Sequence, residues 1–375
     1  MRICITRSSR NAYSETFIRD QIECFSKLAD VYAIHSGRLP EKKENGTLLN
    51  SKLFWALHKI VKGVVGRNNF FGNYGVKKYL KENKIDVVIA NYGMPASHMA
   101  PICKALNIPL LVIFHGHDAT DIKLLNEYHN KYKKLFDYAS YILPVSEDMK
   151  KRLIALGANA DKIKVIPCGV DTYKFKPDGN NVEKKNFIAV GRFTEKKGPL
   201  YTISAFHKAL QKFPEAKLVM VGGKSDLFEK CENKVNELNI NNSVIFTGVL
   251  SSEEIVNLLR TSLAFVQHSI TASNGDMEGT PVGILEASAT GLPIVSTLHG
   301  GIKEAVIHGG SGYLVAEKED VSMAEFMIKL LENLDLAKEI GLNGRNHIIE
   351  NYNQEKQINK IYSLAKDAIN IKASS

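Results

Sequence analysis

Long hydrophobic runs are absent from this chain of 375 residues. No apolar stretch approaches the ~20 residues that a helix needs to cross a bilayer. The opening segment Met1–Thr6 is typical of a strand and not of a signal peptide. The 44% hydrophobic and 24% charged residues are those of a soluble globular protein. We therefore expect a cytosolic protein, and its length suggests two domains.

Patterns that bind metals or cofactors are also missing. The five cysteines are odd in number and lack C-x-x-C spacing, so neither a disulfide framework nor a zinc site is expected. The chain has no G-x-x-x-x-G-K-[ST] phosphate loop and no Asp-x-Asp pair. We therefore predict chemistry that needs no metal ion and no cofactor, in which Arg, Lys and helix N–H groups neutralise a bound phosphate.

Positive charge is concentrated in the first half of the chain. Residues 1–170 contain 26 Lys and Arg against 15 Asp and Glu, a net charge of +11. Residues 171–375 contain 23 against 25, a net charge of −2. Such asymmetry indicates that the first half meets an anionic surface, either a membrane or another polyanion.

Segments typical of strands alternate with segments typical of helices along almost the whole chain. This alternation predicts an α/β fold with two doubly wound, Rossmann-like domains, each built on a parallel sheet. The predicted strands are Arg2–Thr6, Val31–His35, Asp86–Ala90, Leu110–Phe114, Tyr141–Val145, Lys164–Ile166, Phe187–Val190, Lys217–Val221, Val244–Phe246, Ala264–Gln267 and Pro293–Ser296.

The expected domain boundary lies in a polar stretch rich in turn residues. We predict a first domain over residues 1–170, a linker over 171–185, and a second domain over 186–350. The final helix, within 351–375, could cross back to the first domain.

The segment Ser51–Gly66 predicts an unusual helix. Its apolar side chains fall on one helical face, it contains the only tryptophan, Trp55, and lysines flank it. A basic amphipathic helix with an aromatic residue is what an interfacial membrane anchor requires. The alternative is an ordinary helix whose apolar face packs on the core.

A second helix should begin near Thr280 and could bind an anion. Thr280 is a good N-cap, and Pro281 suits the first helical position because its missing N–H would be unpaired there anyway. The N–H groups of Val282 and Gly283 would then be free to hold a diphosphate.

Two carboxylates flank this helix start. Glu278 precedes it and Glu286 lies a turn and a half inside the helix. Carboxylates placed there would repel phosphates, so we expect them to bind hydroxyl groups on either side. A sugar on one side and a ribose on the other would fit.

Basic and glycine-rich turns follow two strands of the predicted second domain. Gly191-Arg192 and Lys197 come after the first of them, where ligands of open α/β sheets bind. Arg192 and Lys197 together could neutralise a diphosphate and stabilise it as a leaving group. The alternative is a solvated basic turn. Gly222-Gly223 ends the next strand and, as a weaker signal, could let backbone approach the same ligand.

Histidines cluster at only one place in the sequence. His115, His117 and Asp118 follow a predicted strand of the first domain and could form a metal site, a base with its orienting acid, or a sugar-contacting loop. Gly300-Gly301 could face a ligand or form a simple turn. The other histidines have no such neighbours, and we assign them core or surface roles: His35, His58, His98, His129, His207, His268, His299, His308 and His347.

Taken together in their order along the chain, these motifs resemble those of family 4 of the retaining nucleotide-sugar glycosyltransferases, whose two-domain architecture is called GT-B. The resemblance covers almost the whole chain. It rests on the pair Glu278 and Glu286, on Gly191-Arg192 with Lys197, and on the segments Val145-Ser146 and Ile166–Asp171, which are similar to the segments that close the two domains on each other.

The resemblance implies a role for several residues. Glu278 would contact hydroxyls of the transferred sugar, Glu286 would contact the ribose of the nucleotide, and His115 would lie near the reacting carbon through its backbone or ring. The departing diphosphate would accept the proton of the incoming hydroxyl on the same face, so no dedicated base would be needed.

Residues near the start of the chain narrow the resemblance. Ser14–Ile18 is similar to a subset of bacterial exopolysaccharide, lipopolysaccharide O-antigen and colanic-acid transferases, whereas the loop Arg7–Tyr13 lacks the glycine pair of many relatives. That subset extends a saccharide on a polyprenyl-diphosphate lipid. We therefore expect a hexosyltransferase that uses a UDP- or GDP-sugar and lies peripherally at the inner face of the plasma membrane.

Four alternatives remain open at this point, one of them a sugar-binding protein that has lost its catalytic activity. The same fold could act on a soluble acceptor, or the chain could be a nucleotide-sugar epimerase of related architecture. From another class, it could be a non-catalytic protein whose basic half binds a polyanion. Binding of nucleic acid is not expected, because the Lys and Arg residues are dispersed among apolar periods and no recognition motif is present.

Overall fold

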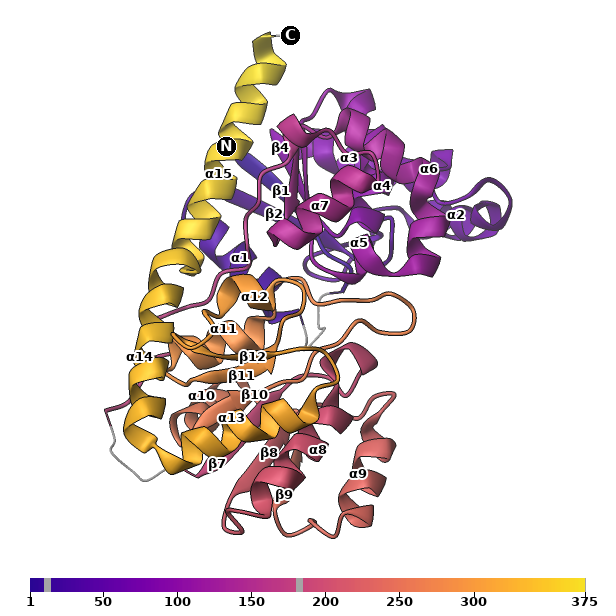
Figure 1. Ribbon diagram of the computed structural model, residues 1–375. Coiled ribbons are helices and arrows are strands. Elements are labelled where there is room, and N and C mark those ends of the chain that lie inside the picture. Colours follow the sequence, from indigo (N-terminus) through magenta and orange to yellow (C-terminus); the bar gives the residue numbers. More distant parts are fainter. Residues whose placement is uncertain (10–14, 180–184, 375) are drawn as a thin grey trace. The chain divides into compact units, whose positions relative to one another are not determined.

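The chain folds into two compact units, each built on its own sheet (Figure 1). The structure is a computed structural model that describes residues 1–9, 15–179 and 185–374. The first unit contains Met1–Pro167 together with Glu355–Ser375, and the second contains Cys168–Gln354. The predicted fold class, two doubly wound α/β domains, is confirmed.

The first unit has a six-stranded sheet in the order β3-β2-β1-β4-β5-β6. All neighbouring strands are parallel except the short β3, which pairs antiparallel with β2. Every residue of β4 and β5 is buried, so both faces of the sheet centre are covered, as parallel sheets require. The strands are β1 (Arg2–Thr6), β2 (Asp30–His35), β3 (Lys42–Lys43), β4 (Val87–Asn91), β5 (Leu110–Phe114) and β6 (Tyr141–Pro144).

The last helix of the chain belongs to the first unit. The Tyr362 hydroxyl donates a hydrogen bond to the carbonyl of Leu28 at 3.2 Å, and Tyr141 contacts Asp367. Helices of this unit are α1 (Thr16–Ser26), α2 (Lys52–Val65), α3 (Phe70–Glu82), α4 (Gly93–Leu106), α5 (His117–Thr120), α6 (Ile122–Tyr138), α7 (Glu147–Ala155), the 3-10 helix η1 (Ala160–Lys162) and α15 (Gln354–Ser374).

The second unit has six parallel strands in the order β12-β11-β10-β7-β8-β9. Its strands are β7 (Asn186–Val190), β8 (Lys217–Val221), β9 (Val244–Gly248), β10 (Ala264–Val266), β11 (Ile294–Thr297) and β12 (Gly312–Val315). Its helices are η2 (Glu195–Lys197, a 3-10 helix), α8 (Pro199–Leu210), α9 (Phe228–Glu237), α10 (Ser252–Arg260), α11 (Val282–Ala289), α12 (Ile302–Ala305), α13 (Asp320–Glu332) and α14 (Leu334–Asn351).

Alternate side chains of these strands enter two separate cores. In β8, Leu218 and Met220 pack in a core with α8, α9 and α13, whereas Val219 and Val221 pack in a second core with α10, α11 and α14. This two-residue period is that of a strand with one side chain on each face. The sheet therefore lies between two layers of helices.

Part of the predicted linker is instead built into the second unit. Val170 and Phe175 are buried in the core that contains α11, and Val170 donates a backbone hydrogen bond to Tyr352 at 2.9 Å. Residues 171–179 are thus attached to the unit that follows them, and residues 180–184 lie outside the described part of the chain. The predicted strand Lys164–Ile166 runs beside β6 with two hydrogen bonds but does not form a regular strand.

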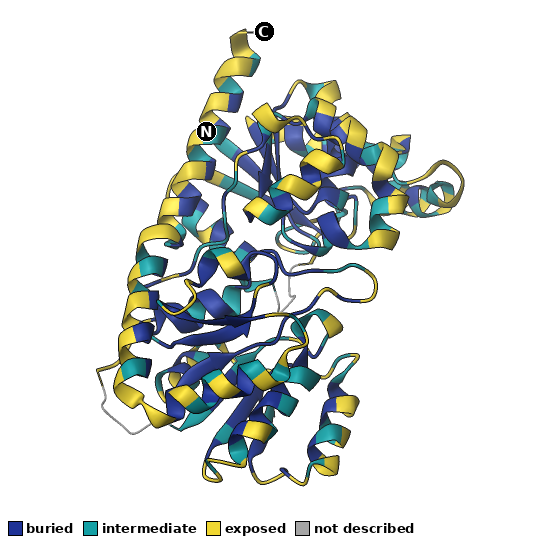
Figure 2. Cartoon of the chain, in the orientation of Figure 1, coloured by how far each residue is buried: buried dark blue, intermediate teal, exposed yellow. Residues whose placement is uncertain are grey.

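Helix α2 does not pack like an ordinary core helix. Of its residues only His58 is buried, while Leu53, Ile60, Val64 and Val65 are 67%, 73%, 88% and 62% exposed. Figure 2 shows exposed residues along this part of the first unit. Phe54, Leu57 and Val61 are partly buried, so the helix packs by one side and leaves other apolar side chains exposed. In the described part of the chain, no helix combines the length and the hydrophobicity needed to cross a bilayer.

Candidate active site

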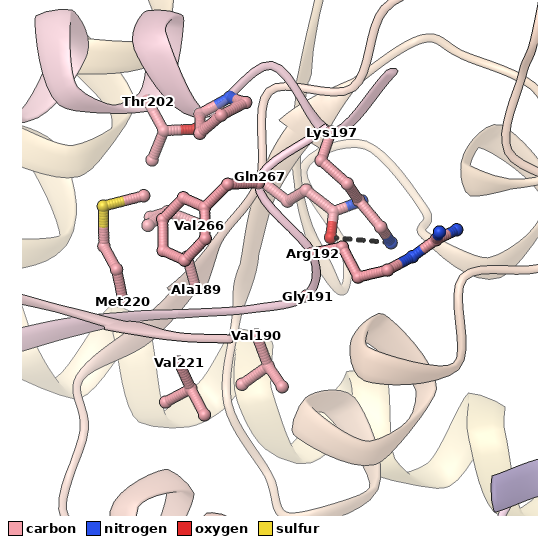
Figure 3. Close-up of a pocket in the computed structure, with 12 residues that line it drawn as sticks. Ala189, Val190, Gly191, Arg192, Lys197, Thr202, Met220, Val221, Val266 and Gln267 are labelled. Carbon is pink, nitrogen blue, oxygen red and sulfur yellow. Dashed lines mark hydrogen bonds between the residues drawn. The ribbon is translucent and has the colours of Figure 1, made fainter. Parts of the chain in front are cut away.

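A basic turn after β7 and a carboxylate before α11 meet in the second unit. The Lys197 ammonium lies 3.3 Å from the Glu278 carboxylate and donates a 3.3 Å hydrogen bond to the side-chain carbonyl of Gln267. Figure 3 shows Lys197 and Gln267 in a pocket that Gly191 and Arg192 also line. Residues 81 positions apart in the sequence thus form one ion pair, as the sequence analysis placed them in one site.

The charges of this pair influence each other. Burial lowers the pKa of the Lys197 ammonium, and the neighbouring Glu278 carboxylate opposes that effect. Burial also acts to raise the pKa of Glu278, but the ammonium groups of Lys197 and Lys196 outweigh it and hold this pKa below its usual value. Lys196 is itself paired with Asp276 at 3.1 Å. The site therefore contains an ionised carboxylate beside a concentrated positive charge.

Helix α11 begins one residue later than predicted. Its first residue is Val282, and Pro281 occupies the cap position with no side-chain capping bond. The expected capping role of Thr280 is therefore wrong, and Thr280 is a buried residue of the preceding loop. Because the ring nitrogen of Pro281 carries no hydrogen, the first backbone N–H groups of the helix are those of Val282 and Gly283.

The start of α11 lies against the end of β7. A Cβ atom added to Gly283 would approach the Val190 carbonyl oxygen to 3.2 Å. Because Val190 immediately precedes Gly191 and Arg192, the helix N-terminus and the basic turn share one edge of the sheet. A helix N-terminus with a nearby guanidinium can hold an anionic group. Glu286 is on the same helix, one turn further along, and is partly exposed.

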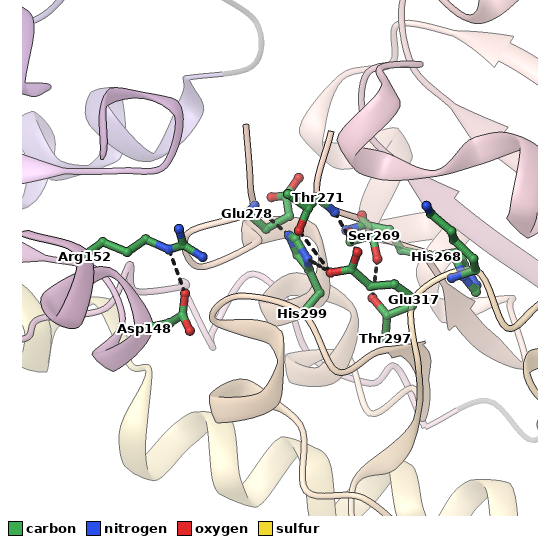
Figure 4. Close-up of polar contacts among 11 residues, drawn as sticks. Asp148, Arg152, His268, Ser269, Thr271, Glu278, Thr297, His299 and Glu317 are labelled. Atoms are coloured by element: carbon green, nitrogen blue, oxygen red, sulfur yellow. Dashed lines mark hydrogen bonds and ion pairs between the residues drawn. The ribbon is translucent and has the colours of Figure 1, made fainter. Parts of the chain in front are cut away.

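The loop after β11 holds the backbone around Glu278 (Figure 4). The N–H of Glu278 donates to the Nε2 atom of His299 at 3.1 Å, and the N–H of Gly301 donates to the Gly279 carbonyl at 3.0 Å. Gly300 has φ +46°, and a Cβ atom there would lie 2.3 Å from the Glu278 carbonyl oxygen. Gly300-Gly301 thus serves close packing of backbone against backbone.

His299 is a residue that the sequence analysis missed. Its ring is buried, and its Nδ1 atom lies 2.6 Å from the Glu317 carboxylate. Glu317 also accepts a 2.9 Å hydrogen bond from the N–H of Thr271. The 18 residues between His299 and Glu317 place them on different loops, so no local motif signals the pair.

Gly222 has a packing role in addition to its place at the end of a strand. A Cβ atom on Gly222 would lie 2.0 Å from the Gly191 carbonyl oxygen. Only glycine allows the β7 and β8 loops to approach this closely. Its neighbour Gly223 is partly exposed.

In the first unit, Asp118 organises the turn after β5. Its carboxylate accepts hydrogen bonds from the N–H groups of Gly93, His115 and Gly116 at 3.0, 3.0 and 2.9 Å. An Asp with three backbone donors fixes a loop conformation. Within residues 1–9, 15–179 and 185–374, no group of three or more His, Cys, Asp and Glu side chains is placed to hold a metal ion.

His115 is held as a neutral imidazole. Its Nε2 atom lies 2.9 Å from the side-chain oxygen of Asn91, whose amide nitrogen donates to Gln21 at 2.9 Å. Burial lowers the pKa of His115 to about 4. Because the Asn91 oxygen can only accept, the proton of His115 is on Nε2. Its buried Nδ1 atom has no hydrogen-bond partner among the described residues and is left as an acceptor.

Glu15 joins the strand ends of this unit. It accepts hydrogen bonds from the hydroxyls of Ser8 at 3.1 Å and Tyr92 at 3.2 Å. Tyr92 has φ +70°, a left-handed conformation that is rare for a side chain of its size. The expectations for Arg7–Tyr13 and Ser14–Ile18 fall partly on residues 10–14, which lie outside the described residues.

The two open sheets, parallel except for β3, with their polar residues at the carboxyl ends of strands, define a protein of the two-domain GT-B class. Comparison with family models agrees with this class. Residues 15–174 match the model described as Glycosyltransferase Family 4, and residues 171–347 match that of glycosyl transferases group 1.

Known proteins resemble the chain over most of its length. The amylovoran biosynthesis glycosyltransferase AmsK of Erwinia amylovora is 30% identical over 308 residues, which cover 78% of this chain and 75% of that protein. WcaL of Escherichia coli, assigned to colanic acid biosynthesis, is 29% identical over 352 residues, covering 83% and 86%. The chain belongs to glycosyltransferase family 4 and is a glycosyltransferase.

A solved structure supports the fold. The Anabaena protein HepE, crystallised in complex with UDP and glucose, matches with a TM-score of 0.77 at 18% identity. The match covers 98% of this chain and 100% of that one. At this level of identity the likeness concerns the fold alone.

Proposed function

We propose that this protein is a retaining hexosyltransferase that uses a UDP- or GDP-sugar and extends a lipid-linked saccharide in exopolysaccharide or lipopolysaccharide biosynthesis. The observation that carries the proposal is the ion pair between Lys197 and Glu278 beside the start of α11. Relatives named for amylovoran and colanic acid biosynthesis support the polymer class. The UDP complex of HepE supports a nucleotide-sugar donor.

In this proposal the donor diphosphate displaces one carboxylate contact of Lys197. Arg192 is exposed and its charge is available to a ligand. Together with Lys197 and the N–H groups of Val282 and Gly283, it neutralises the diphosphate. Glu278 is thereby freed to accept hydrogen bonds from hydroxyls of the transferred sugar, and Glu286 accepts those of the ribose. A carboxylate is suited to both tasks because it only accepts hydrogen bonds when ionised.

The chemical step in this proposal requires no additional base. The bond between the sugar C1 atom and the diphosphate oxygen breaks while a bond forms between C1 and the acceptor oxygen on the same face. The acceptor proton passes to the departing diphosphate oxygen, whose negative charge Arg192 and Lys197 stabilise. His115 would lie near the reacting carbon of the transferred sugar, through its backbone or its ring.

Donor binding is the first experimental test of this proposal. We expect UDP or GDP, and the corresponding nucleotide sugars, to raise the melting temperature, since a ligand that binds only the folded state stabilises it. A concentration of 100 times Kd would add about 2.7 kcal/mol. A panel of UDP-, GDP-, dTDP- and CMP-sugars in a thermal-shift assay measures this. No shift with any of them would contradict the proposed donor class.

The proposed acceptor side is an anionic membrane surface at the inner face of the plasma membrane. We define the α2–α3 surface by its exposed apolar residues Leu53, Ile60, Val64, Val65 and Phe70. The Phe54 ring lies tilted against that of Phe70 and edge-on to that of Phe71, with ring centroids 6.4 and 5.4 Å apart. Exposed apolar side chains mixed with lysine are typical of a protein that lies on a membrane.

The charge of the same unit favours an anionic lipid over a neutral one. Lys52 and Lys62 lie on α2, where Lys59 is paired with Glu41 at 2.7 Å, and residues 1–170 carry a net charge of +11. Basic residues near an anionic leaflet contribute about 1 kcal/mol each. Held there, the enzyme would meet a saccharide whose lipid anchor lies in the same membrane.

Replacing Ile60 and Val64 together by Glu should abolish binding to vesicles of phosphatidylglycerol and phosphatidylcholine. The change removes apolar surface that is 73% and 88% exposed and places negative charge against the anionic lipid. Cosedimentation at low and high salt measures the effect. Val321→Glu, a substitution of a residue that is 51% exposed on α13, is the matched control and should bind like the wild type. Failure of the wild type to bind vesicles would favour a soluble acceptor.

A further inference from the structure

The backbone N–H of Glu278 is bound by a histidine on a different loop. His299 follows β11, and its Nε2 atom accepts this N–H at 3.1 Å. Since a backbone N–H can only donate, Nε2 must carry a lone pair and no proton. The contact therefore assigns the neutral ring proton to Nδ1.

The Nδ1 side of the ring faces a carboxylate that can only accept. Glu317 lies 2.6 Å away, and it is held in turn by the N–H of Thr271 at 2.9 Å and by its hydroxyl at 3.3 Å. Burial acts to raise the pKa of Glu317, but the hydrogen bonds from His299 and Thr271 outweigh it and leave this pKa below its usual value. Glu317 thus stays ionised and selects the Nδ1–H tautomer of His299.

The backbone is also held on the other side of Glu278. Gly301 donates to the Gly279 carbonyl at 3.0 Å, and Gly300 allows contact with the Glu278 carbonyl that no larger residue permits. The Cα of Glu278 is therefore fixed from both sides. The carboxylate can then move only by rotation about the side-chain bonds of Glu278. The Lys197 ammonium, 3.3 Å away, restrains that rotation.

We infer that His299 is a positioning residue for the reaction: with Glu317 setting its tautomer, it holds the backbone of Glu278 where the carboxylate meets the transferred sugar. This inference rests on the role proposed above for Glu278. Figure 4 shows the chain of contacts from Thr271 through Glu317 and His299 to Glu278. An error of about 1 Å in a reacting geometry can cost 10²-fold in rate. His299 therefore affects turnover without touching the substrate.

Two substitutions of His299 by amide side chains distinguish this positioning role from a general packing role. In His299→Gln, the side-chain oxygen reaches the position of Nε2 and can accept the Glu278 N–H. In His299→Asn, the shorter side chain reaches only the Nδ1 position and can bond Glu317 alone. Both variants keep a polar group in the same buried space, so any difference between them reports on the Glu278 contact.

The test measures nucleotide release from the best donor of a panel containing UDP-glucose, UDP-galactose and GDP-mannose. We expect His299→Asn to lower kcat about 10²-fold, with KM, nucleotide affinity and melting temperature close to those of the wild type. His299→Gln should recover most of that loss. In a Glu278→Ala background, His299→Asn should lower kcat no further, because it acts through Glu278.

Three results have distinct meanings. Full kcat in His299→Asn, while Glu278→Ala is inactive, would overturn the inference and leave the proposed function intact. Equal loss in the Asn and Gln variants, with equal loss of melting temperature, would reduce His299 to a packing residue. Full activity of Glu278→Ala would overturn the role of Glu278 itself, and with it this inference.

A measurement on the wild-type protein does not depend on how the variants fold. The ¹⁵N NMR signals of the His299 ring should show an unprotonated Nε2 and a protonated Nδ1. Glu317→Ala, which removes the acceptor, should shift the ring toward the other tautomer or toward exchange between the two. A protonated Nε2 in the wild type would contradict the inference.

Discussion

Glu278→Ala should remove most of the turnover while leaving nucleotide binding intact. The loss should be on the order of 10²- to 10³-fold in kcat, the effect of removing one group that stabilises the transition state. The diphosphate contacts are made by other groups, so affinity for UDP or GDP should be unchanged or stronger. It would be stronger because Lys197 no longer shares its charge with a carboxylate 3.3 Å away.

Glu278→Gln is the matched control for this substitution. It keeps the size and some hydrogen bonding of the side chain but removes the negative charge that compensates Lys197. Initial rates of nucleotide release and isothermal titration with UDP and GDP measure the two properties separately. A Glu278→Ala protein with wild-type kcat would contradict the assigned role.

Arg192→Ala should weaken nucleotide binding and turnover together. Arg192 is exposed at the end of β7, and its charge-assisted hydrogen bonds to a diphosphate should contribute about 1.5–3 kcal/mol. That range corresponds to a Kd higher by about 10- to 100-fold, since 1.4 kcal/mol is a factor of ten. The reaction should also slow, because the same guanidinium stabilises the departing diphosphate.

Lys338→Ala is a suitable control for the loss of one positive charge. Lys338 is exposed on α14, outside the loops at the carboxyl ends of the strands. Titration calorimetry with UDP and GDP compares the two variants under the same salt conditions. Equal nucleotide affinity in Arg192→Ala and the wild type would remove Arg192 from the diphosphate site.

Much of the fold could be predicted because buried parallel strands have a simple sequence signature. β4 and β5 are runs of apolar residues that end in polar turns, and in the structure they are buried throughout. The two-residue β3 has no such signature, because its residues are Lys42 and Lys43. Its pairing with β2 depends on the course of the chain and not on its own composition.

The start of α11 shows where local rules reach their limit. Threonine followed by proline is a good beginning for a helix, yet the helix starts one residue later. The preceding loop makes a tertiary contact that local rules do not consider: the Gly279 carbonyl accepts a hydrogen bond from Gly301 on another loop. The sequence nevertheless predicts Glu278, Val282, Gly283 and Glu286 as candidate site residues, and the structure places Glu278 beside Lys197.

The polar contacts of His299 could not be predicted from the sequence. His299 had no neighbour in the sequence that suggested a role, because its partners Glu278 and Glu317 lie 21 and 18 residues away. In the same way, the amphipathic pattern of α2 predicted an apolar face but not what covers it. The structure shows that face largely exposed.

The most direct test of the account is donor turnover on one set of samples. Wild-type protein, with anionic vesicles that carry a polyprenyl-diphosphate-linked saccharide, should release UDP or GDP from at least one nucleotide sugar, and Glu278→Ala should release it about 10²- to 10³-fold more slowly. Release that depends on the acceptor and on Glu278 is the result that the account predicts. Absence of release from every donor, or equal release by wild type and Glu278→Ala, would contradict it.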